Sequence, residues 1–281
     1  MRRRDTRKDT LSYSSNRRAG RLAPVVERYF SEGEPVGRPE VLVFPNLEDL
    51  SQQAASRFEE LANRRITEGH IFAAALSGGS TPRQLYQLLA SPPFSDRIPW
   101  RSVHLFQVDE RCVAPDHPDS NYRMVHEALL SKGLVPALNF HRIAAELPDR
   151  DAAARQYADE LARILKPHAS EWPRLDLVFL GMGPDGHTAS LFPGSSALNE
   201  ESRWVVPNYV DQLKAWRLTL TLPVLNAAAE VIFLVAGADK AETLRRVLDA
   251  SSEADQFPAQ RIRPAEGQVR WYVEQAAARL L

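Results

Sequence analysis

Apolar and polar positions follow two alternating rhythms along most of this chain. Short, almost wholly apolar runs, typical of strands buried on both faces, alternate with stretches whose apolar residues recur every three or four positions, as on one side of a helix. The apolar runs predict strands over residues 40–44, 71–76, 103–108, 175–180, 217–222, 231–236 and 269–273. The helical spacing predicts helices over residues 47–61, 81–89, 120–130, 151–165, 225–229, 240–248 and 274–280.

The order of these elements predicts an α/β fold. Strands that alternate with helices pair in parallel and carry helices on both faces, so we expect a single domain over residues 39–281 with a mostly parallel, Rossmann-like sheet. In open sheets of this kind, ligands bind outside the carboxyl ends of the strands. Three polar loops follow predicted strands, and we expect them to meet at one rim: residues 77–81, 109–111 and 183–187.

Residues 1–38 differ in composition from the rest, being rich in arginine and serine and poor in apolar side chains. We expect a basic, disordered extension outside the folded domain. An organelle transit peptide or a basic anchoring arm is the alternative. The Arg17-Arg18 pair is not followed by the apolar run that a twin-arginine export signal needs.

The overall composition limits what the protein binds. The 281 residues carry a formal net charge of -1, so no general field favours nucleic acid or an anionic membrane. Cys112 is the only cysteine, which excludes an intramolecular disulfide and a cysteine-rich metal site. No run approaches the roughly 18 apolar residues of a membrane span. We expect a cytoplasmic protein, a monomer or weak homodimer, whose partner is a small molecule.

A glycine loop follows the second predicted strand. Gly78 and Gly79 allow the backbone to approach a ligand, Ser80 and Thr81 add hydroxyl donors, and the next helix offers unpaired N–H groups at its start. A phosphate group is the natural ligand for such a loop. Neither the P-loop nor the dinucleotide-binding glycine pattern is present, and a simple tight turn with a serine cap is the alternative.

Charged residues follow the third predicted strand. Asp109, Glu110 and Arg111 stand directly after the apolar run. The arginine can bind a carboxylate, a phosphate or a developing oxyanion, and Asp109 can orient it or act as a base. A salt bridge at a strand end is the alternative explanation.

Asp185 and His187 lie among three glycines in residues 181–187, just past the fourth predicted strand. We expect a sharp turn there and a helix over residues 188–191. Asp185 can cap that helix or fix the tautomer of the imidazole. No second histidine or cysteine stands at ligand spacing, so we expect neither a metal nor a cofactor.

Two cations in the second half complete the candidate set. Arg217 begins a predicted strand and Lys240 begins a predicted helix. Each alone is explained by a solvated surface charge. Together with the glycine loop, they can form a phosphate pocket.

Six motifs occur in order along the chain. They are GGSTP (78–82), DER (109–111), SNYR (120–123), GMGPDGHTASLFPG (181–194), RLTLTLPVLN (217–226) and GADKAE (237–242). Through these motifs the chain resembles, over residues 40–281, the 6-phosphogluconolactonases of the glucosamine-6-phosphate isomerase/6-phosphogluconolactonase family. Two mild departures are residues 106–108, an unusual approach to DER, and His117, in a loop usually richer in acids.

The resemblance implies hydrolysis of 6-phospho-D-glucono-1,5-lactone to 6-phosphogluconate, without a metal, in the oxidative pentose phosphate pathway. His187 matches the proposed general base of the family and Arg111 its active-site arginine. The loop of residues 78–81, together with Arg217 and Lys240, matches the phosphate-binding positions. A lactone is an activated ester, so a water activated by His187 suffices as nucleophile.

Two other functions remain as alternatives. An amino-sugar-phosphate deaminase on the same fold would use an aspartate base, for which Asp109 is suitably placed. A sugar-phosphate sensor would bind without turnover, but such regulators usually carry a DNA-binding domain, and the basic start is too short for one.

Overall fold

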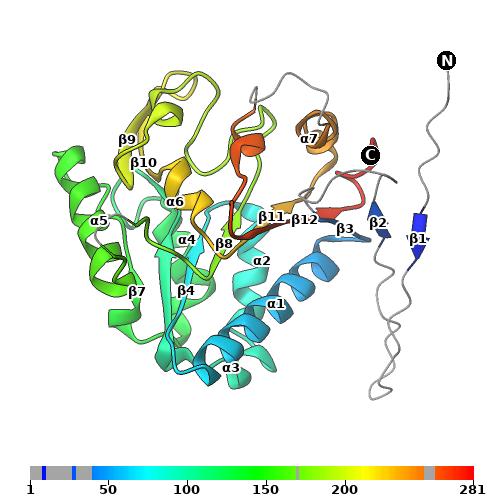
Figure 1. The fold of residues 1–281 in the computed structure, drawn as a ribbon, viewed down its shortest axis with the longest axis horizontal. Helices are drawn as coiled ribbons and strands as arrows, with labels where there is room; N and C mark the ends of the chain where they lie inside the picture. Colours follow the sequence, from blue (N-terminus) through cyan, green and yellow to red (C-terminus); the bar gives the residue numbers. More distant parts are fainter. Residues whose placement is uncertain (1–7, 11–26, 30–39, 169–170, 250–256) are drawn as a thin grey trace.

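A nine-stranded sheet forms the centre of the molecule (Figure 1), in the order β1-β2-β3-β12-β11-β8-β4-β5-β7. The computed structural model describes residues 8–10, 27–29, 40–168, 171–249 and 257–281. The seven strands from β3 to β7 in this order run parallel. Their bounds are β3 Glu40–Phe44, β12 Gln268–Glu274, β11 Glu230–Val235, β8 Leu177–Leu180, β4 Phe72–Leu76, β5 Val103–Gln107 and β7 Phe140–His141.

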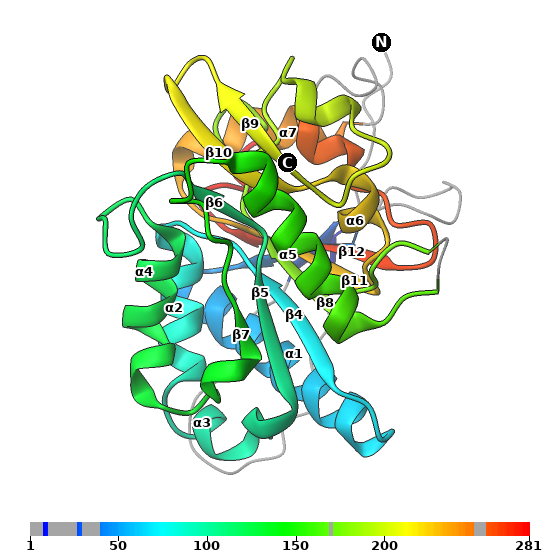
Figure 2. The same ribbon diagram turned by 90° about the vertical axis from the view of Figure 1, so that its left-hand side faces the viewer.

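Helices cover both faces of this sheet, as Figures 1 and 2 show. Each face has its own apolar core, because wholly buried strands present side chains to both sides. One core packs under α1 Leu47–Thr67, α2 Ser80–Leu89, α3 Phe94–Arg97 and α4 Asn121–Ala128. The other packs under α5 Arg150–Leu165, α6 Leu222–Asn226 and α7 Ala241–Leu248. The predicted α/β, mostly parallel architecture is confirmed.

Helix α1 shows how closely local signals fix an element. The side chain of Asn46 accepts a hydrogen bond from the backbone N–H of Asp49 at 2.9 Å, so the predicted cap is present. Apolar residues at helical spacing then face the core, among them Leu50 and Phe58. The helix continues to Thr67, six residues past its last predicted apolar position at Leu61, because polar residues on the solvent side do not end a helix.

A second, three-stranded sheet was not expected from the sequence. It has the order β6-β10-β9, with β6 Asp109–Arg111, β10 Ala215–Leu220 and β9 Val205–Val210, and both pairings are antiparallel. Residues 109–111 were predicted as a loop and β9 was not predicted. The sequence of three charged residues does not indicate a strand by itself. Residues 109–111 form one only through their pairing with β10, about a hundred residues further along the chain.

Two predicted helices are absent. Residues after Glu274 form turns rather than a closing helix, because β12 extends through that residue. Residues 188–191 form a turn in which Ala189 has a φ of 52° and Thr188 pairs with Leu191. A left-handed residue cannot continue a helix, so this prediction was wrong.

The remaining short elements lie between the main ones. The predicted helix of residues 225–229 begins earlier, as α6. Single 3₁₀ turns occur at η1 Trp100–Ser102, η2 Leu130–Lys132, η3 Ala137–Asn139, η4 Ser196–Asn199, η5 Ala238–Lys240 and η6 Pro258–Arg261. No helix in the described ranges is both long enough and apolar enough to cross a membrane.

The amino-terminal region contributes two short strands. β1 Lys8–Thr10 and β2 Glu27–Tyr29 pair antiparallel with each other, and β2 pairs antiparallel with β3. Neither strand was expected. The rest of the predicted extension, residues 1–38, lies outside the described residues.

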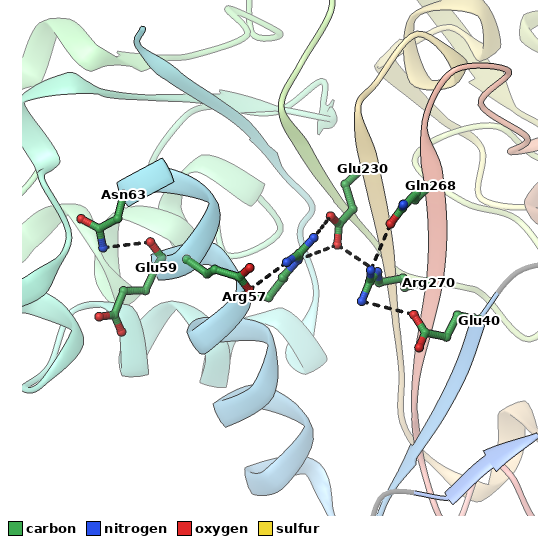
Figure 3. A network of polar contacts seen from close by, with 8 residues as sticks. Glu40, Arg57, Glu59, Asn63, Glu230, Gln268 and Arg270 are labelled. Carbon is green, nitrogen blue, oxygen red and sulfur yellow. Dashed lines mark hydrogen bonds and ion pairs between the residues drawn. The ribbon is translucent and has the colours of Figure 1, made fainter. Parts of the chain in front are cut away.

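The amino ends of three parallel strands are joined by ion pairs among one buried and three half-buried side chains (Figure 3). Glu230 begins β11, and its side chain is 5% exposed. Its carboxylate accepts two hydrogen bonds from the guanidinium of Arg57 in α1, at 2.6 and 3.0 Å. Arg270 of β12 lies 3.3 Å from the same carboxylate and 3.2 Å from Glu40 of β3. Each charge in this network has an opposite charge beside it.

Candidate active site

Two arginines lie directly opposite each other on the small sheet. In the strand register, Arg217 of β10 pairs with Arg111 of β6 on one side and with Asn208 of β9 on the other. The Nε atoms of both arginines are buried, and neither Nε has a hydrogen-bond partner among the described residues, although Nη1 of Arg111 donates to the carbonyl oxygen of Asp119. Like charges placed opposite each other repel. This row of side chains is therefore suited to receive an anion.

The surroundings of Arg217 reinforce this interpretation. Burial lowers the pKa of its guanidinium from the ordinary value. The carboxylate of Asp109 opposes that shift, while the charge of Arg111 adds to it. Burial and the neighbouring arginine both disfavour the charged form of this guanidinium, so a ligand with negative charge would stabilise it.

Glu110 holds the strand and the next helix together. Its carboxylate accepts hydrogen bonds from the backbone N–H groups of Arg111 at 2.8 Å and of Asn121 and Tyr122 at 2.7 Å. Burial raises the pKa of Glu110, and these N–H groups oppose the shift. The carboxylate thus stabilises the start of α4 and fixes the backbone that carries Arg111.

Asp109 is buried, with 5% of its surface exposed. One carboxylate oxygen accepts a hydrogen bond from Asn121 Nδ2 at 3.1 Å, and the other accepts one from Ser190 Oγ at 2.6 Å. Both oxygens are therefore engaged by protein groups.

The glycine loop lies against this cluster. A Cβ added to Gly78 would stand 1.7 Å from Asn121 Oδ1, so only glycine allows the close approach. Gly79 has a φ of 110° and precedes α2, whose first turn receives no side-chain cap. The exposed loop presents the N-terminus of a ten-residue helix, with the hydroxyls of Ser80 and Thr81 in its first turn. Such an end attracts a phosphate group.

The imidazole of His187 has a defined orientation. Asp185 Oδ1 lies 2.5 Å from His187 Nδ1 and also accepts the backbone N–H of His187 at 3.2 Å. The ring stacks on Phe192 with centroids 4.0 Å apart, and a Cβ at Gly183 would lie 2.2 Å from it. A carboxylate at Nδ1 favours the tautomer with the proton there, which leaves the lone pair on Nε2. The side chain is 28% exposed, so part of the ring is accessible from the surface.

The charge of Asp185 is favoured by the same contact. Burial alone would raise the pKa of its carboxyl group, but the hydrogen bond and the charge of His187 bring the pKa below the ordinary value. Asp185 is thus an acceptor for Nδ1–H rather than the cap of a helix.

Lys240 lies at the end of η5 and leads into α7. Its Nζ is 2.8 Å from Asp239 Oδ2, and the side chain is 20% exposed. The first turn of α7 reaches the histidine loop, because Thr243 Oγ1 donates to the carbonyl oxygen of Pro184. The helix that follows Lys240 therefore lies against the histidine loop.

Contacts link several of the predicted site residues. The glycine loop packs against Asn121 of α4, Asn121 donates to Asp109, and Asp109 accepts from Ser190 in the loop that follows His187. Ser190 lay in a predicted helix and Asn208 in a strand that was not predicted, and neither was predicted as a site residue. Asn121 lies in the SNYR motif, but no local pattern predicted its contact with Asp109. In the described part of the chain, no cluster of three or more His, Cys, Asp or Glu side chains is placed to bind a metal.

Comparison with known proteins identifies the family. The family model described as glucosamine-6-phosphate isomerases/6-phosphogluconolactonase matches residues 45–271. The chain belongs to this family. The resemblance expected from the motifs is thereby confirmed.

Relatives within the family carry the lactonase name. The 6-phosphogluconolactonase of Synechocystis sp. is 38% identical over 239 residues, covering 85% of this chain and 97% of that protein. That of Nostoc sp. is 40% identical over 206 residues, covering 73% and 83%. A rice relative, 36% identical over 252 residues and covering 86% and 76%, is named a probable chloroplastic 6-phosphogluconolactonase, so a cytoplasmic location stays a prediction here.

Solved structures of the family have the same fold. The 6-phosphogluconolactonase of Leishmania guyanensis superimposes with a TM-score of 0.75 at 30% identity, covering 85% of this chain and 97% of that one. The enzyme of Trypanosoma brucei gives 0.77 at 29% identity, covering 87% and 99%. A monomeric glucosamine-6-phosphate deaminase, at 20% identity and 0.72, shares the fold alone.

Proposed function

We propose that this chain hydrolyses 6-phospho-D-glucono-1,5-lactone to 6-phospho-D-gluconate in the oxidative pentose phosphate pathway. The names of its relatives support the reaction. The observation that carries the mechanism is the Asp185–His187 pair, whose ring is partly exposed, on a fold that also holds two facing arginines whose Nε atoms lack a hydrogen-bond partner among the described residues. That combination suits attack by water on a carbonyl group in an anionic substrate.

His187 acts as a general base in this mechanism. Its Nε2 takes a proton from a water molecule as the water oxygen bonds to C1 of the lactone. Asp185 holds the ring through Nδ1 and favours the imidazolium that forms. Such assistance accelerates a reaction by about 10²- to 10⁴-fold.

Negative charge then develops on the former carbonyl oxygen. The guanidinium of Arg111 stabilises that charge. When the tetrahedral intermediate collapses, the bond between C1 and the ring oxygen breaks, and His187 returns its proton to the departing oxygen. No covalent intermediate with the protein is needed.

The phosphate group anchors the other end of the substrate. We assign it to the loop of Gly78, Gly79, Ser80 and Thr81, with Arg217 and Lys240 as the nearby cations. This anchor positions the lactone rather than changing its chemistry. Without the phosphate, a sugar lactone loses its main source of binding energy.

A comparison of three substrates tests the proposal. We expect rapid hydrolysis of 6-phosphogluconolactone, measured by release of 6-phosphogluconate, and hydrolysis of unphosphorylated gluconolactone that is slower by at least about 100-fold in kcat/KM. Ammonia release from glucosamine 6-phosphate should be absent. Equal rates with the two lactones would contradict the phosphate anchor, and ammonia release without lactone hydrolysis would establish a deaminase instead.

A further inference from the structure

We infer that Ser190 is a positioning residue that fixes the loop of His187 to the small sheet, and that Asp109 acts through Ser190 rather than as a base. The inference rests on the proposed function, because it concerns the group assigned there as the general base. It deepens that proposal by explaining what holds the imidazole in place.

Every polar atom of Ser190 is bound to a different strand of the small sheet. Its Oγ donates to Asp109 Oδ2 of β6 at 2.6 Å, and its backbone N–H donates to Thr219 Oγ1 of β10 at 3.3 Å. Its carbonyl oxygen accepts from Asn208 Nδ2 of β9 at 2.8 Å. Ser190 is fully buried, and its three partners are at most 5% exposed. Hydrogen bonds at such depth are costly to break.

These contacts are needed because the loop itself has no regular structure. Between His187 and Ser190 the chain passes through Thr188, bonded to the carbonyl oxygen of Gly181, and Ala189, with its φ of 52°. A turn with a left-handed alanine is held by its surroundings and not by local preference. The three bonds of Ser190 supply the support that a helix would otherwise give.

The contacts of Asp109 agree with a positioning function. A general base needs a free oxygen within reach of the substrate proton. Asp109 instead engages one oxygen with Asn121 and the other with Ser190, and it is buried. Its carboxylate joins the glycine loop side of the site to the histidine side.

The first experiment compares Ser190→Ala with Thr221→Val. Both changes remove one hydroxyl from a fully buried residue, and Thr221 Oγ1 donates to the carbonyl oxygens of Arg203 and Trp204 rather than to a group of the histidine loop. We expect Ser190→Ala to lower kcat about 10- to 100-fold with KM changed less than about threefold, because displacement of the base affects the reacting geometry. Thr221→Val should keep the wild-type kcat. Equal kcat values in the two variants would overturn the inference.

A second readout does not depend on turnover. The short contact with Asp185 predicts a strongly downfield N–H resonance for Nδ1 of His187 in the proton NMR spectrum. We expect Ser190→Ala to shift or broaden that resonance and Thr221→Val to leave it unchanged. An unchanged resonance in Ser190→Ala contradicts the positioning function. If His187 proved not to be the base, this signal would still report whether Ser190 orients it.

The third experiment separates positioning from base catalysis by Asp109. In Asp109→Asn, the amide oxygen can still accept the hydroxyl of Ser190, so we expect kcat to fall by no more than about tenfold. A fall of about 10³-fold or more in this variant would make Asp109 the base.

Discussion

Partly buried arginines occur at both ends of the central sheet, but their partners differ. At the amino end, Arg57 and Arg270 share the carboxylate of Glu230 (Figure 3). At the carboxyl end, Arg111 and Arg217 face each other, and within the described ranges neither forms an ion pair with a carboxylate. The first set is complete within the protein. We propose that a ligand completes the second set.

The difference shows how the same residue type serves stability in one place and binding in another. A buried ion pair adds little net stability, yet removal of one partner is costly, because the other charge is left buried. Unpaired buried cations already carry that cost in the free protein. Their removal is therefore expected to relieve the fold and to harm only the bound state.

Replacement of Arg217 should give the largest effect in this comparison. We expect Arg217→Met to lower kcat/KM for the phosphorylated lactone by about 100-fold. The free energy of unfolding should stay the same or rise by up to about 1 kcal/mol, because the repulsion by Arg111 is relieved. Steady-state kinetics and urea unfolding measure the two quantities.

Thermal unfolding with inorganic phosphate is a second test of the function of Arg217. Phosphate should raise the melting temperature of the wild-type protein and have no effect on Arg217→Met. A large loss of stability in Arg217→Met would show that this arginine is structural, like those at the amino end.

The corresponding substitution at the amino end, Arg57→Met, should reduce stability and leave activity nearly unchanged. We expect Arg57→Met to lower the free energy of unfolding by about 2 to 3 kcal/mol, since Glu230 retains only Arg270. The value of kcat/KM should stay within about twofold of the wild type. If Arg57→Met lowered kcat/KM as far as Arg217→Met does and kept its stability, the arginines at the two ends would not be divided between stability and binding.

The smallest expected effect concerns Asp185 and pH. Its pKa is below the ordinary value in the folded protein, so its ionised form stabilises the fold, and that stability is lost as the pH falls through the folded pKa. We expect Asp185→Asn to lower the free energy of unfolding by less than about 1 kcal/mol at neutral pH, because the side chain is 41% exposed. Urea unfolding between about pH 3 and 7 should show this difference shrinking below about pH 4. A difference that grew at acidic pH would contradict the sign of the shift.

Much of the fold could be predicted from local patterns. The wholly apolar strands and the capped, amphipathic α1 carry their signals within a few residues, so the parallel sheet and its carboxyl-edge loops were foreseen. The small sheet was not, because the pairing of Asp109–Arg111 with β10 depends on contacts remote in sequence. The turn at Ala189 was predicted as a helix, since its left-handed φ is imposed by the packing around it.

The site was predictable in its chemistry but not in its connections. Glycines and charged residues at strand ends indicated the groups that meet a ligand. No sequence pattern indicates that the carboxylate of Asp109 binds Ser190, or that Asn208 and Arg217 stand side by side. Such contacts arise only when strands from distant segments are placed in register.

The turnover of His187→Gln tests the central claim most directly. The account predicts that kcat for 6-phosphogluconolactone falls by at least about 100-fold, while 6-phosphogluconate binds with an affinity close to that of the wild type. A kcat near the wild-type value in this variant would contradict the assignment of His187 as the base.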